Sequence, residues 1–465
     1  AALLALSAPD SDPPRVIVTS DNTIISQSCT LEVPEGHAIA DLDGNGVVLI
    51  EADDIVVTFA PGGVLRGAGA DTAPNLFAGT GISIANHKNV RIQGGTISGF
   101  KIGLLAQHAD GLTVHDTRFD NNYRQLLRST TYAEDGADWL FPHENDQRQW
   151  ASQHGAALCI ERSENVEVAR VSARRGQNGL IIDRVNNAKI FDNDLSFLSG
   201  WGLTMWRSSR NTITRNALDF CVRGHSEGKY NRGQDSAGIL CFEQCNDNVI
   251  AENSVTHGGD GFFGFAGKEA IGEKPADEIN YADAGCNRNI IVGNDFSYAP
   301  AHGLELTFSE HNIIWKNRFA ENAICGIWGG YSSDNWIVDN TFERNGGMAY
   351  GLERGGVNME HASRNIIIEN RFINNRCGVH LWWDNDGALL ALPGVKAGYT
   401  GVSENIIGDN RFVMDAENPW KNSTSPRMIG VQLRDTGTAN VHDNFYAANI
   451  AAITDDRSIE MDAPT

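Results

Sequence analysis

The sequence contains no apolar run that approaches the roughly 18 residues needed for a membrane-spanning helix. Amphipathic helical periodicity is also scarce, while glycine is abundant at 49 residues. These two absences exclude a helical membrane protein and a helical bundle. They favour an all-β chain without a membrane span.

Positive charge is in short supply. The chain carries 37 lysines and arginines against 59 aspartates and glutamates, which gives a formal net charge of −22. Such an excess of negative charge repels nucleic-acid phosphates and offers no basic footprint. We therefore expect no nucleic-acid partner.

The eight cysteines form no Cys-x-x-Cys pair and no zinc-ligand spacing. We expect them to be small buried hydrophobic residues rather than disulfides or zinc ligands. No metal site is predicted from histidine either, because His302, His361 and His380 fall at different positions in the repeating units of the chain.

A repeat dominates what is present. An asparagine is followed two residues later by an apolar residue at Asn193/Leu195, Asn216/Leu218, Asn294/Phe296, Asn317/Phe319, Asn340/Phe342, Asn370/Phe372 and Asn410/Phe412. The steps from 193 to 216, from 294 to 317 and from 317 to 340 are each 23 residues. That length suits one coil of a β-helix and is too short for a βαβ unit. Asparagine at each turn is interpreted as a structural ladder.

A second repeat is a strand that begins with glycine and alternates two apolar with two variable positions. It occurs at 179–183, 202–206, 238–242, 261–265, 303–307, 326–330, 356–360, 378–382 and 430–434. The second and fourth residues of each strand are mostly apolar, so they should point into the core. The third and fifth should then face outward on one continuous sheet.

The chain divides into a signal-peptide remnant or flexible tail (1–13) and one β-helix domain (14–465). Within that domain we expect an amino-terminal cap over about 14–80, coils over about 81–450 and a tail over 451–465. Long insertions interrupt four coils, and in a solenoid such insertions form loops that line the binding face. They lie at about 130–152, 222–236, 267–287 and 384–401.

These motifs resemble those of the pectin-lyase-like superfamily, whose members are right-handed parallel β-helices. The resemblance implies a solenoid of about 12 coils and a secreted or periplasmic protein. It leaves the reaction open, since such proteins include glycoside hydrolases, polysaccharide lyases, epimerases and non-catalytic members. The Asn-Thr-Asp and Gly-His-Gly motifs expected of polygalacturonases and the Asp-Pro-His motif expected of mannuronan epimerases are absent. No catalytic residue is carried over from those families.

Three acids are the predicted catalytic residues. Asp235, Asp260 and Glu305 fall at or just before the outward strand in three successive coils. Neighbouring coils stack about 4.8 Å apart, which places these carboxyl groups roughly 5–10 Å from one another. Glycoside hydrolysis uses two carboxyl groups at such separations. The alternative is that Asp235 and Asp260 only cap turns.

A saccharide-binding surface is predicted beside the acids, since flat rings with polar edges nearby suit sugar binding. Its members are Trp206, Trp328 and Trp382 with Glu360 and His380 on the outward sheet, and Arg232, Tyr230 and His302 next to the acids. The alternative is that the insertions fold over these rings as a second core.

The favoured function is therefore an exported glycoside hydrolase acting on a polysaccharide or oligosaccharide. The first alternative is a uronic-acid lyase or epimerase in which Arg232, Tyr230 and His302 act, and the second is a non-catalytic glycan-binding β-helix. We expect no cofactor, with calcium as an alternative because Asp384 and Asp386 open the fourth insertion. The oligomeric state stays open.

Overall fold

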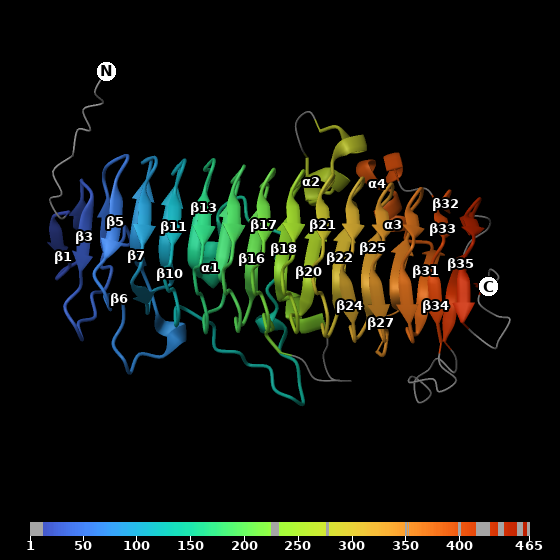
Figure 1. Cartoon of the computed structure of the whole chain (residues 1–465), viewed down its shortest axis with the longest axis horizontal. Coiled ribbons are helices and arrows are strands. Elements are labelled where there is room, and N and C mark those ends of the chain that lie inside the picture. Colours follow the sequence, from blue (N-terminus) through green and yellow to red (C-terminus); the bar gives the residue numbers. More distant parts are fainter. Residues whose placement is uncertain are drawn as a thin grey trace, which may run out of the picture.

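The computed structural model describes residues 13–224, 232–275, 279–348, 351, 353–398, 401–414, 428–435, 441–452 and 459–462. The chain winds into coils that stack along one long axis, with β1 (Arg15–Ile17) at one end and β35 (Ile429–Asp435) near the other (Figure 1). All strand pairs in the long sheets are parallel, as a solenoid of coils requires.

The first sheet has 15 strands. In stacking order they are β1, β3 (Cys29–Glu32), β5 (Val56–Phe59), β8 (Arg91–Gln93), β11 (Thr113–His115), β13 (Glu167–Ala169), β15 (Lys189–Phe191), β17 (Thr212–Thr214), β19 (Val249–Ala251), β21 (Ile290–Val292), β23 (Ile313–Trp315), β26 (Trp336–Val338), β29 (Ile366–Ile368), β33 (Ile406–Gly408) and β37 (Phe445–Ala447).

The second sheet also has 15 strands and contains the glycine-led repeat. In stacking order they are β2 (Thr23–Ile25), β4 (Val48–Ile50), β7 (Thr80–Ala85), β10 (Ile102–Gln107), β12 (Ala156–Glu161), β14 (Leu180–Asp183), β16 (Trp201–Trp206), β18 (Ala237–Phe242), β20 (Asp260–Phe265), β22 (His302–Thr307), β25 (Cys325–Gly330), β28 (Gly355–Glu360), β31 (Cys377–Trp383), β35 and β39 (Ile459–Asp462).

Shorter elements complete the coils. A third sheet of five strands comprises β24 (Arg318–Ala320), β27 (Thr341–Glu343), β30 (Arg371–Ile373), β34 (Arg411–Val413) and β38 (Ile450–Ala452). Two strand pairs are β6 (Val64–Arg66) with β9 (Thr96–Ser98), and β32 (Val402–Ser403) with β36 (Val441–His442). The helices are α1 (Gln149–His154), α2 (Lys268–Ile271), α3 (Gly387–Leu390) and α4 (Pro393–Gly398), with 3-10 turns η1 (Pro74–Leu76), η2 (Gly136–Asp138), η3 (Arg232–Asp235) and η4 (Tyr281–Asp283).

The all-β parallel helix expected from the sequence is confirmed, but it has more coils than the expected 12 or so. The segment interpreted as a cap, 14–80, already pairs in register with the coil after it, since Val48 aligns with Ile82 and Val57 with Ile92. It is therefore part of the solenoid. Among the described helices, none is long and apolar enough to cross a membrane.

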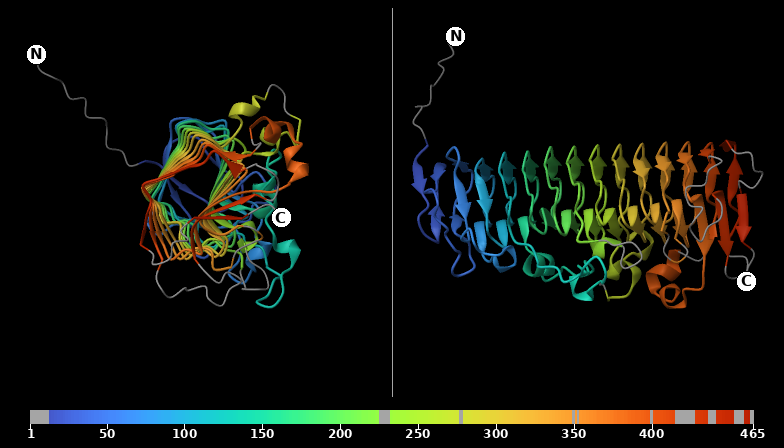
Figure 2. Two further views of the ribbon diagram at one scale, coloured as in Figure 1. Left: turned by 90° about the vertical axis from the view of Figure 1, so that its right-hand side faces the viewer. Right: turned by 90° about the horizontal axis from the view of Figure 1, so that it is seen from below.

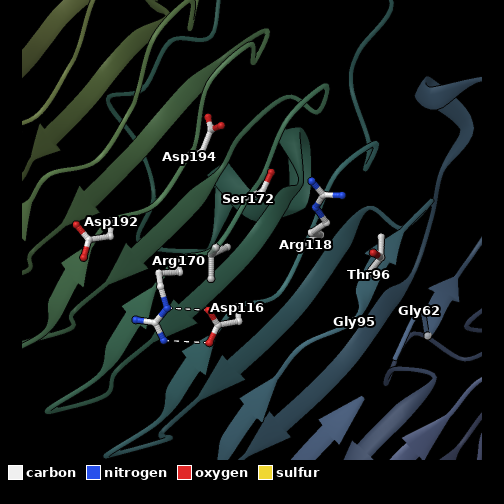
Figure 3. A pocket seen from close by; sticks show the side chains of 11 residues that line it. Gly62, Gly95, Thr96, Asp116, Arg118, Arg170, Ser172, Asp192 and Asp194 are labelled. Atoms are coloured by element: carbon white, nitrogen blue, oxygen red, sulfur yellow. Dashed lines mark hydrogen bonds and ion pairs between the residues drawn. The ribbon is translucent and has the colours of Figure 1, made fainter. Parts of the chain in front are cut away.

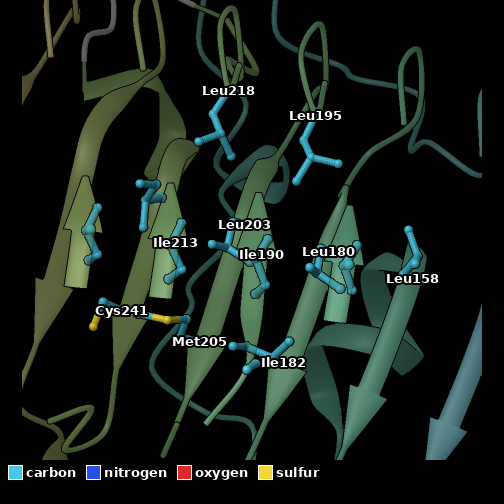
Figure 4. Close-up of a cluster of buried hydrophobic side chains, with 14 of the residues drawn as sticks. Leu158, Leu180, Ile182, Ile190, Leu195, Leu203, Met205, Ile213, Leu218 and Cys241 are labelled. Atoms are coloured by element: carbon cyan, nitrogen blue, oxygen red, sulfur yellow. The ribbon is translucent and has the colours of Figure 1, made fainter. Parts of the chain in front are cut away.

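The core fills the inside of the coils with aligned aliphatic rows. Leu158, Leu180 and Leu203 occupy the same register on β12, β14 and β16, and all three are fully buried (Figure 4). Leu180 and Leu203 are the second residues of glycine-led strands, so the predicted inward positions are confirmed. All eight cysteines are buried thiols, as expected.

Stacked asparagines hold neighbouring coils together from Asn193 to Asn449. The side-chain oxygen of Asn317 accepts hydrogen bonds from the backbone and side-chain nitrogens of Asn294 at 2.9 and 3.0 Å. Its amide in turn donates to Asn340 Oδ1 at 3.1 Å and to the carbonyl of Ile291 at 2.8 Å. The ladder satisfies turn backbone that would otherwise be buried without partners.

The insertions gather on one side of the stack (Figure 2). There α1 from the first insertion packs on the outward face of the second sheet, where Trp150 meets Trp201 and Trp206 with ring centroids 5.4 and 5.2 Å apart. Helices α2 and α4 of the third and fourth insertions contact each other. The predicted alternative of a second core beneath the insertions is thus confirmed for this part of the sheet.

We expect Asn317→Ala to lower the free energy of unfolding by at least about 2 kcal/mol, because it leaves several buried amide and carbonyl groups without partners. Denaturant unfolding followed by circular dichroism measures the change. Lys316→Ala is the matched control, since its side chain is 55% exposed and its ion-pair contact is long at 3.9 Å. Equal stability of the two variants would contradict a stabilising role of the ladder.

Candidate active site

A pocket of about 420 Å³ opens on the outward face of the second sheet. Residues from the first two insertions and from strands β20, β22 and β25 surround it. Its lining is Trp139, Phe141, His143, Arg232, Asp235, Phe263, Phe265, Glu305, Thr307, Phe308 and Trp328. Two predicted acids and the predicted Arg232 therefore share a pocket whose walls are aromatic.

The strand register places Glu305 in this pocket. Glu305 aligns with Phe263 on one side and Trp328 on the other, as the repeat predicted. Its side chain is 95% buried, and its Oε2 lies 3.1 Å from His302 Nδ1 and 3.5 Å from Arg232 Nη2. Burying a carboxylate this deeply is costly unless cationic partners lie next to it, and His302 and Arg232 are those partners.

His302 lies at the centre of an acidic network. Its Nδ1 is 3.1 Å from Asp260 Oδ1 and 3.1 Å from Glu305 Oε2, while its Nε2 is 2.9 Å from Glu353 Oε2. Its backbone N–H also donates to Asp260 at 2.9 Å. Burial alone would lower the pKa of His302, but Cys325 and the acceptors Asp260 and Glu305 raise it well above its ordinary value. We therefore take His302 as an imidazolium held in place by carboxylates.

Asp235 reaches the pocket through an unusual turn. Residues Arg232, Gly233, Gln234 and Asp235 all have positive φ, at 61°, 55°, 56° and 58°. Left-handed backbone is costly for residues other than glycine, so such a run is maintained only where the surroundings impose it. A Cβ on Gly233 would meet the Gly259 Cα at 2.3 Å, so only glycine fits there. The turn is anchored by the Trp201 indole, which donates to the carbonyl of Asp235 at 2.7 Å.

The acids outnumber the cations around this pocket. Burial and then the neighbouring Asp260 raise the pKa of Asp235 to about 7, although Arg232 opposes the shift. Burial also raises the pKa of Glu305, against the opposing effect of His302 and Arg232. The four surrounding carboxylates outweigh burial and raise the pKa of Arg232 above its ordinary value. Asp235 is thus the group best placed to hold a proton near neutral pH.

Asp260, the third predicted acid, does not line the pocket. It is 98% buried and bonds to His302. Its position differs from that of Glu305 because Asp260 begins β20, whereas Glu305 lies in the middle of β22. Glu353 was missed in the sequence because it precedes β28 outside the strand repeat; only the tertiary fold brings it to His302.

The predicted binding residues separate into groups. Trp328 lines the pocket and its ring stacks on His302, with centroids 5.6 Å apart. The prediction that Trp206 belongs to the binding surface is wrong, because Trp150 of the first insertion covers this residue and leaves it 1% exposed. Tyr230 lies outside the described residues.

The other predicted binding residues lie farther along the stack. His380 is three coils from Glu305 in the same row, about 14 Å at the usual strand separation. It is fully buried and bonds to Asn358 Oδ1 at 2.9 Å. Glu360 and Trp382 are neighbours in the adjacent outward row, at 8% and 5% exposure. None of these three lines the aromatic pocket.

Another pocket, of about 550 Å³, lies on a different part of the surface (Figure 3). In it the Arg170 guanidinium faces Asp116 with two bonds of 2.7 and 3.0 Å. Hydrogen bonds from Arg170 and from Arg215 hold the pKa of Asp116 and of Asp192 below their usual range. Because an arginine pairs with each of these two carboxylates and keeps it ionised, Asp116 and Asp192 do not form an acid–base pair near neutral pH.

Two family models match the chain. Residues 277–391 match the model described as right handed beta helix region, and residues 66–271 match that of the periplasmic copper-binding protein NosD. With the parallel sheets, these findings show that the chain is a right-handed parallel β-helix protein. No curated protein matches the chain in sequence.

Several solved structures are similar to the chain at low identity. One is the A-module of the mannuronan C-5 epimerase AlgE4 of Azotobacter vinelandii, with 11% identity, 97% of this chain and 86% of that chain covered, and a TM-score of 0.40. Another is DFA-IIIase of Arthrobacter chlorophenolicus without its lid, with 12% identity, coverage of 84% and 83%, and a TM-score of 0.39. The periplasmic alginate epimerase AlgG follows with 10% identity, coverage of 95% and 79%, and a TM-score of 0.32.

The copper named by one of these models has no evident ligand set here. Among the described residues, four groups of three converging histidine or acidic side chains occur, and only Asp260–His302–Glu305 includes a residue of the segment 66–271. The nitrogens of that histidine already bond to carboxylates. We therefore assign no copper chemistry to the pocket.

We expect the pH dependence of stability to report the proton on Asp235. Its pKa is 3.8 when unfolded and about 7 when folded, so the folded state holds a proton that the unfolded state releases. This carboxyl group stabilises the fold at low pH, and its contribution falls as pH rises from about 4 to about 7, by at most about 1.4 kcal/mol per pH unit.

Asp235→Asn should remove this part of the slope. The measurement is the free energy of unfolding at closely spaced pH values for both proteins, and their difference isolates the group. Asp192→Asn is the control, because the pKa of Asp192 is lowered and its effect falls below this window. Parallel curves for wild type and Asp235→Asn would contradict the raised pKa.

Proposed function

We propose that the chain is an exported carbohydrate-active enzyme, a glycoside hydrolase that uses Asp235 and Glu305 as its catalytic pair. One observation carries this proposal: the two carboxyl groups open onto the same aromatic pocket in different electrostatic environments. Carboxyl pairs whose surroundings separate their protonation states are the usual acid–base arrangement of glycosidases.

In this proposal Asp235 is the general acid. With a pKa of about 7 it holds its proton at neutral pH and gives it to the glycosidic oxygen as the bond to the anomeric carbon breaks. Glu305 acts as the carboxylate on the other side, attacking the anomeric carbon directly or by deprotonating a water. Arg232 and His302, at 3.5 and 3.1 Å, favour its ionised form despite burial.

The aromatic walls suit the substrate. Phe263, Phe308 and Trp328 present rings to the pocket, and such rings pack against the apolar faces of pyranoses. Asp260 and Glu353 are positioning residues in this scheme, because each acts on the reaction only through His302. The proposed substrate is a polysaccharide or oligosaccharide, and its sugar is left open.

The lyase or epimerase alternative needs a base able to take a proton from carbon. Both ring nitrogens of His302 already face carboxylates, and the side chain is fully buried. This arrangement suits a fixed cation better than a base. Export is supported by the family model, described as periplasmic, that residues 66–271 match.

The test is incubation with a panel of plant, algal and microbial polysaccharides, following new reducing ends and unsaturated-uronate absorbance in parallel. We expect reducing ends without absorbance. Glu305→Gln should lower kcat by about 10³-fold or more, since it removes the reacting carboxylate. Asp235→Asn should lose on the order of 10²–10⁴-fold on natural glycans and much less on aryl glycosides, whose leaving groups need no proton.

Glu243→Gln is the matched control. Burial raises the pKa of Glu243 to about 7 as well, but the residue lies outside the pocket and bonds to the Lys268 backbone at 3.0 Å. This variant should keep its activity. Full activity in Glu305→Gln, or unsaturated products from the wild type, would overturn the proposal.

A further inference from the structure

A second acidic group lies two coils from Glu305, where the fourth insertion leaves the sheet. Glu360 ends β28, His361 follows it, and Asp384 comes directly after β31. One ligand atom from each of these three residues lies within 4.8 Å of the other two. They therefore converge on a volume small enough for one ion.

Two aromatic rings contact the histidine of this group. His361 is fully buried and stacks on Tyr331 at a centroid distance of 4.7 Å, while the tilted ring of Trp383 lies 5.2 Å away. Its Nε2 lies 3.1 Å from Asp384 Oδ1 and accepts the backbone N–H of Asp384 at 3.3 Å. The Nε2 is therefore the ring nitrogen that lies next to the carboxylate of Asp384.

The carboxylate of Glu360 lacks the partners that buried acids have. The residue is 92% buried, yet in the described part of the chain its side chain makes no hydrogen bond and no ion pair. No arginine or lysine among the described residues pairs with Glu360, Asp384 or Asp386, and the Tyr331 hydroxyl donates to Asp386 at 3.0 Å. The Nδ1 of His361 is also buried without a partner there. A buried acid left in this state is costly unless a proton or a cation joins it.

In two other groups of the same composition, basic side chains neutralise the carboxylates. At Asp260–His302–Glu305 the imidazolium and Arg232 occupy the place of a cation. At Glu310–His311–Asp334, on the surface, Arg364 binds Asp334 through two bonds of 2.8 and 2.7 Å. Of these three groups, only the one around Glu360 has no basic side chain among the described residues to fill this role.

We propose that Glu360, His361 and Asp384 bind a divalent transition-metal ion of the Mn²⁺ or Zn²⁺ class. Two carboxylates and one imidazole suit such ions, whereas Ca²⁺ prefers a set of oxygen ligands. The sequence led us to expect no metal site and offered calcium at Asp384 and Asp386 as the alternative. The ion ties the start of the fourth insertion to the second sheet, and through α4 to α2 of the third insertion.

The proposal is tested by calorimetric titration of the full chain, freed of metal by chelation and dialysis, with Mn²⁺, Zn²⁺ and Ca²⁺ in turn. We expect one equivalent of Mn²⁺ or Zn²⁺ to bind, at least about tenfold more tightly than Ca²⁺. Glu360→Gln should weaken binding by about tenfold or more. In chelator the same variant should melt no lower than the wild type, because a neutral amide replaces an acid that, without a cation, needs a proton to be buried.

Glu310→Gln is the matched control, since the three residues of its group have the same order and spacing along the chain as those around Glu360. It should bind the ion as the wild type does. Asp384→Asn provides a second ligand variant if Glu360→Gln folds poorly. No saturable binding, unchanged affinity in the ligand variants, or equal loss in Glu310→Gln would overturn the site and show that a proton on Glu360 suffices. Because binding is measured without a glycan, this outcome is independent of the hydrolase proposal.

Discussion

The parallel stacking of one coil on the next is the constraint on which the rest of the molecule depends. Backbone pairing holds neighbouring strands about 4.8 Å apart, so residues at matching positions become neighbours although tens of residues separate them in the chain. Phe263, Glu305 and Trp328 meet in this way. The asparagine ladder, made of short polar side chains that tolerate this burial because each bonds to the next, keeps the register from slipping.

A charged side chain in a row of stacked outward positions needs a counter-charge. An acid in such a row has other side chains above and below it and little water, so its counter-charge has to come from a neighbouring row or from an insertion. Glu305 obtains it from His302 at the start of its own strand and from Arg232 in the second insertion. The left-handed turn around Gly233 is strained, and this turn positions both Arg232 and Asp235 at the pocket.

Aromatic residues divide between two roles according to what covers them. Trp206 and Phe242 lie beneath Trp150 of the first insertion and add to a second hydrophobic core on the sheet. Trp328, farther along the stack, is only partly covered and remains at the pocket wall. The insertions thus both bury one stretch of the outward face and form the walls of the pocket beside it.

The sequence by itself determined the solenoid, its inward rows and the position of Glu305 between Phe263 and Trp328, because these follow from a strict local period. It also indicated that 14–80 differs in pattern, yet β1 to β5 pair like the later coils, since pairing depends on backbone register more than on the repeat motif. Only the tertiary structure showed that Glu353 contacts His302, that Trp150 covers Trp206, and that Asp260 bonds to His302 instead of lining the pocket. Those contacts depend on how irregular segments fold back over the sheet, and a periodic sequence pattern does not predict the course of such a segment.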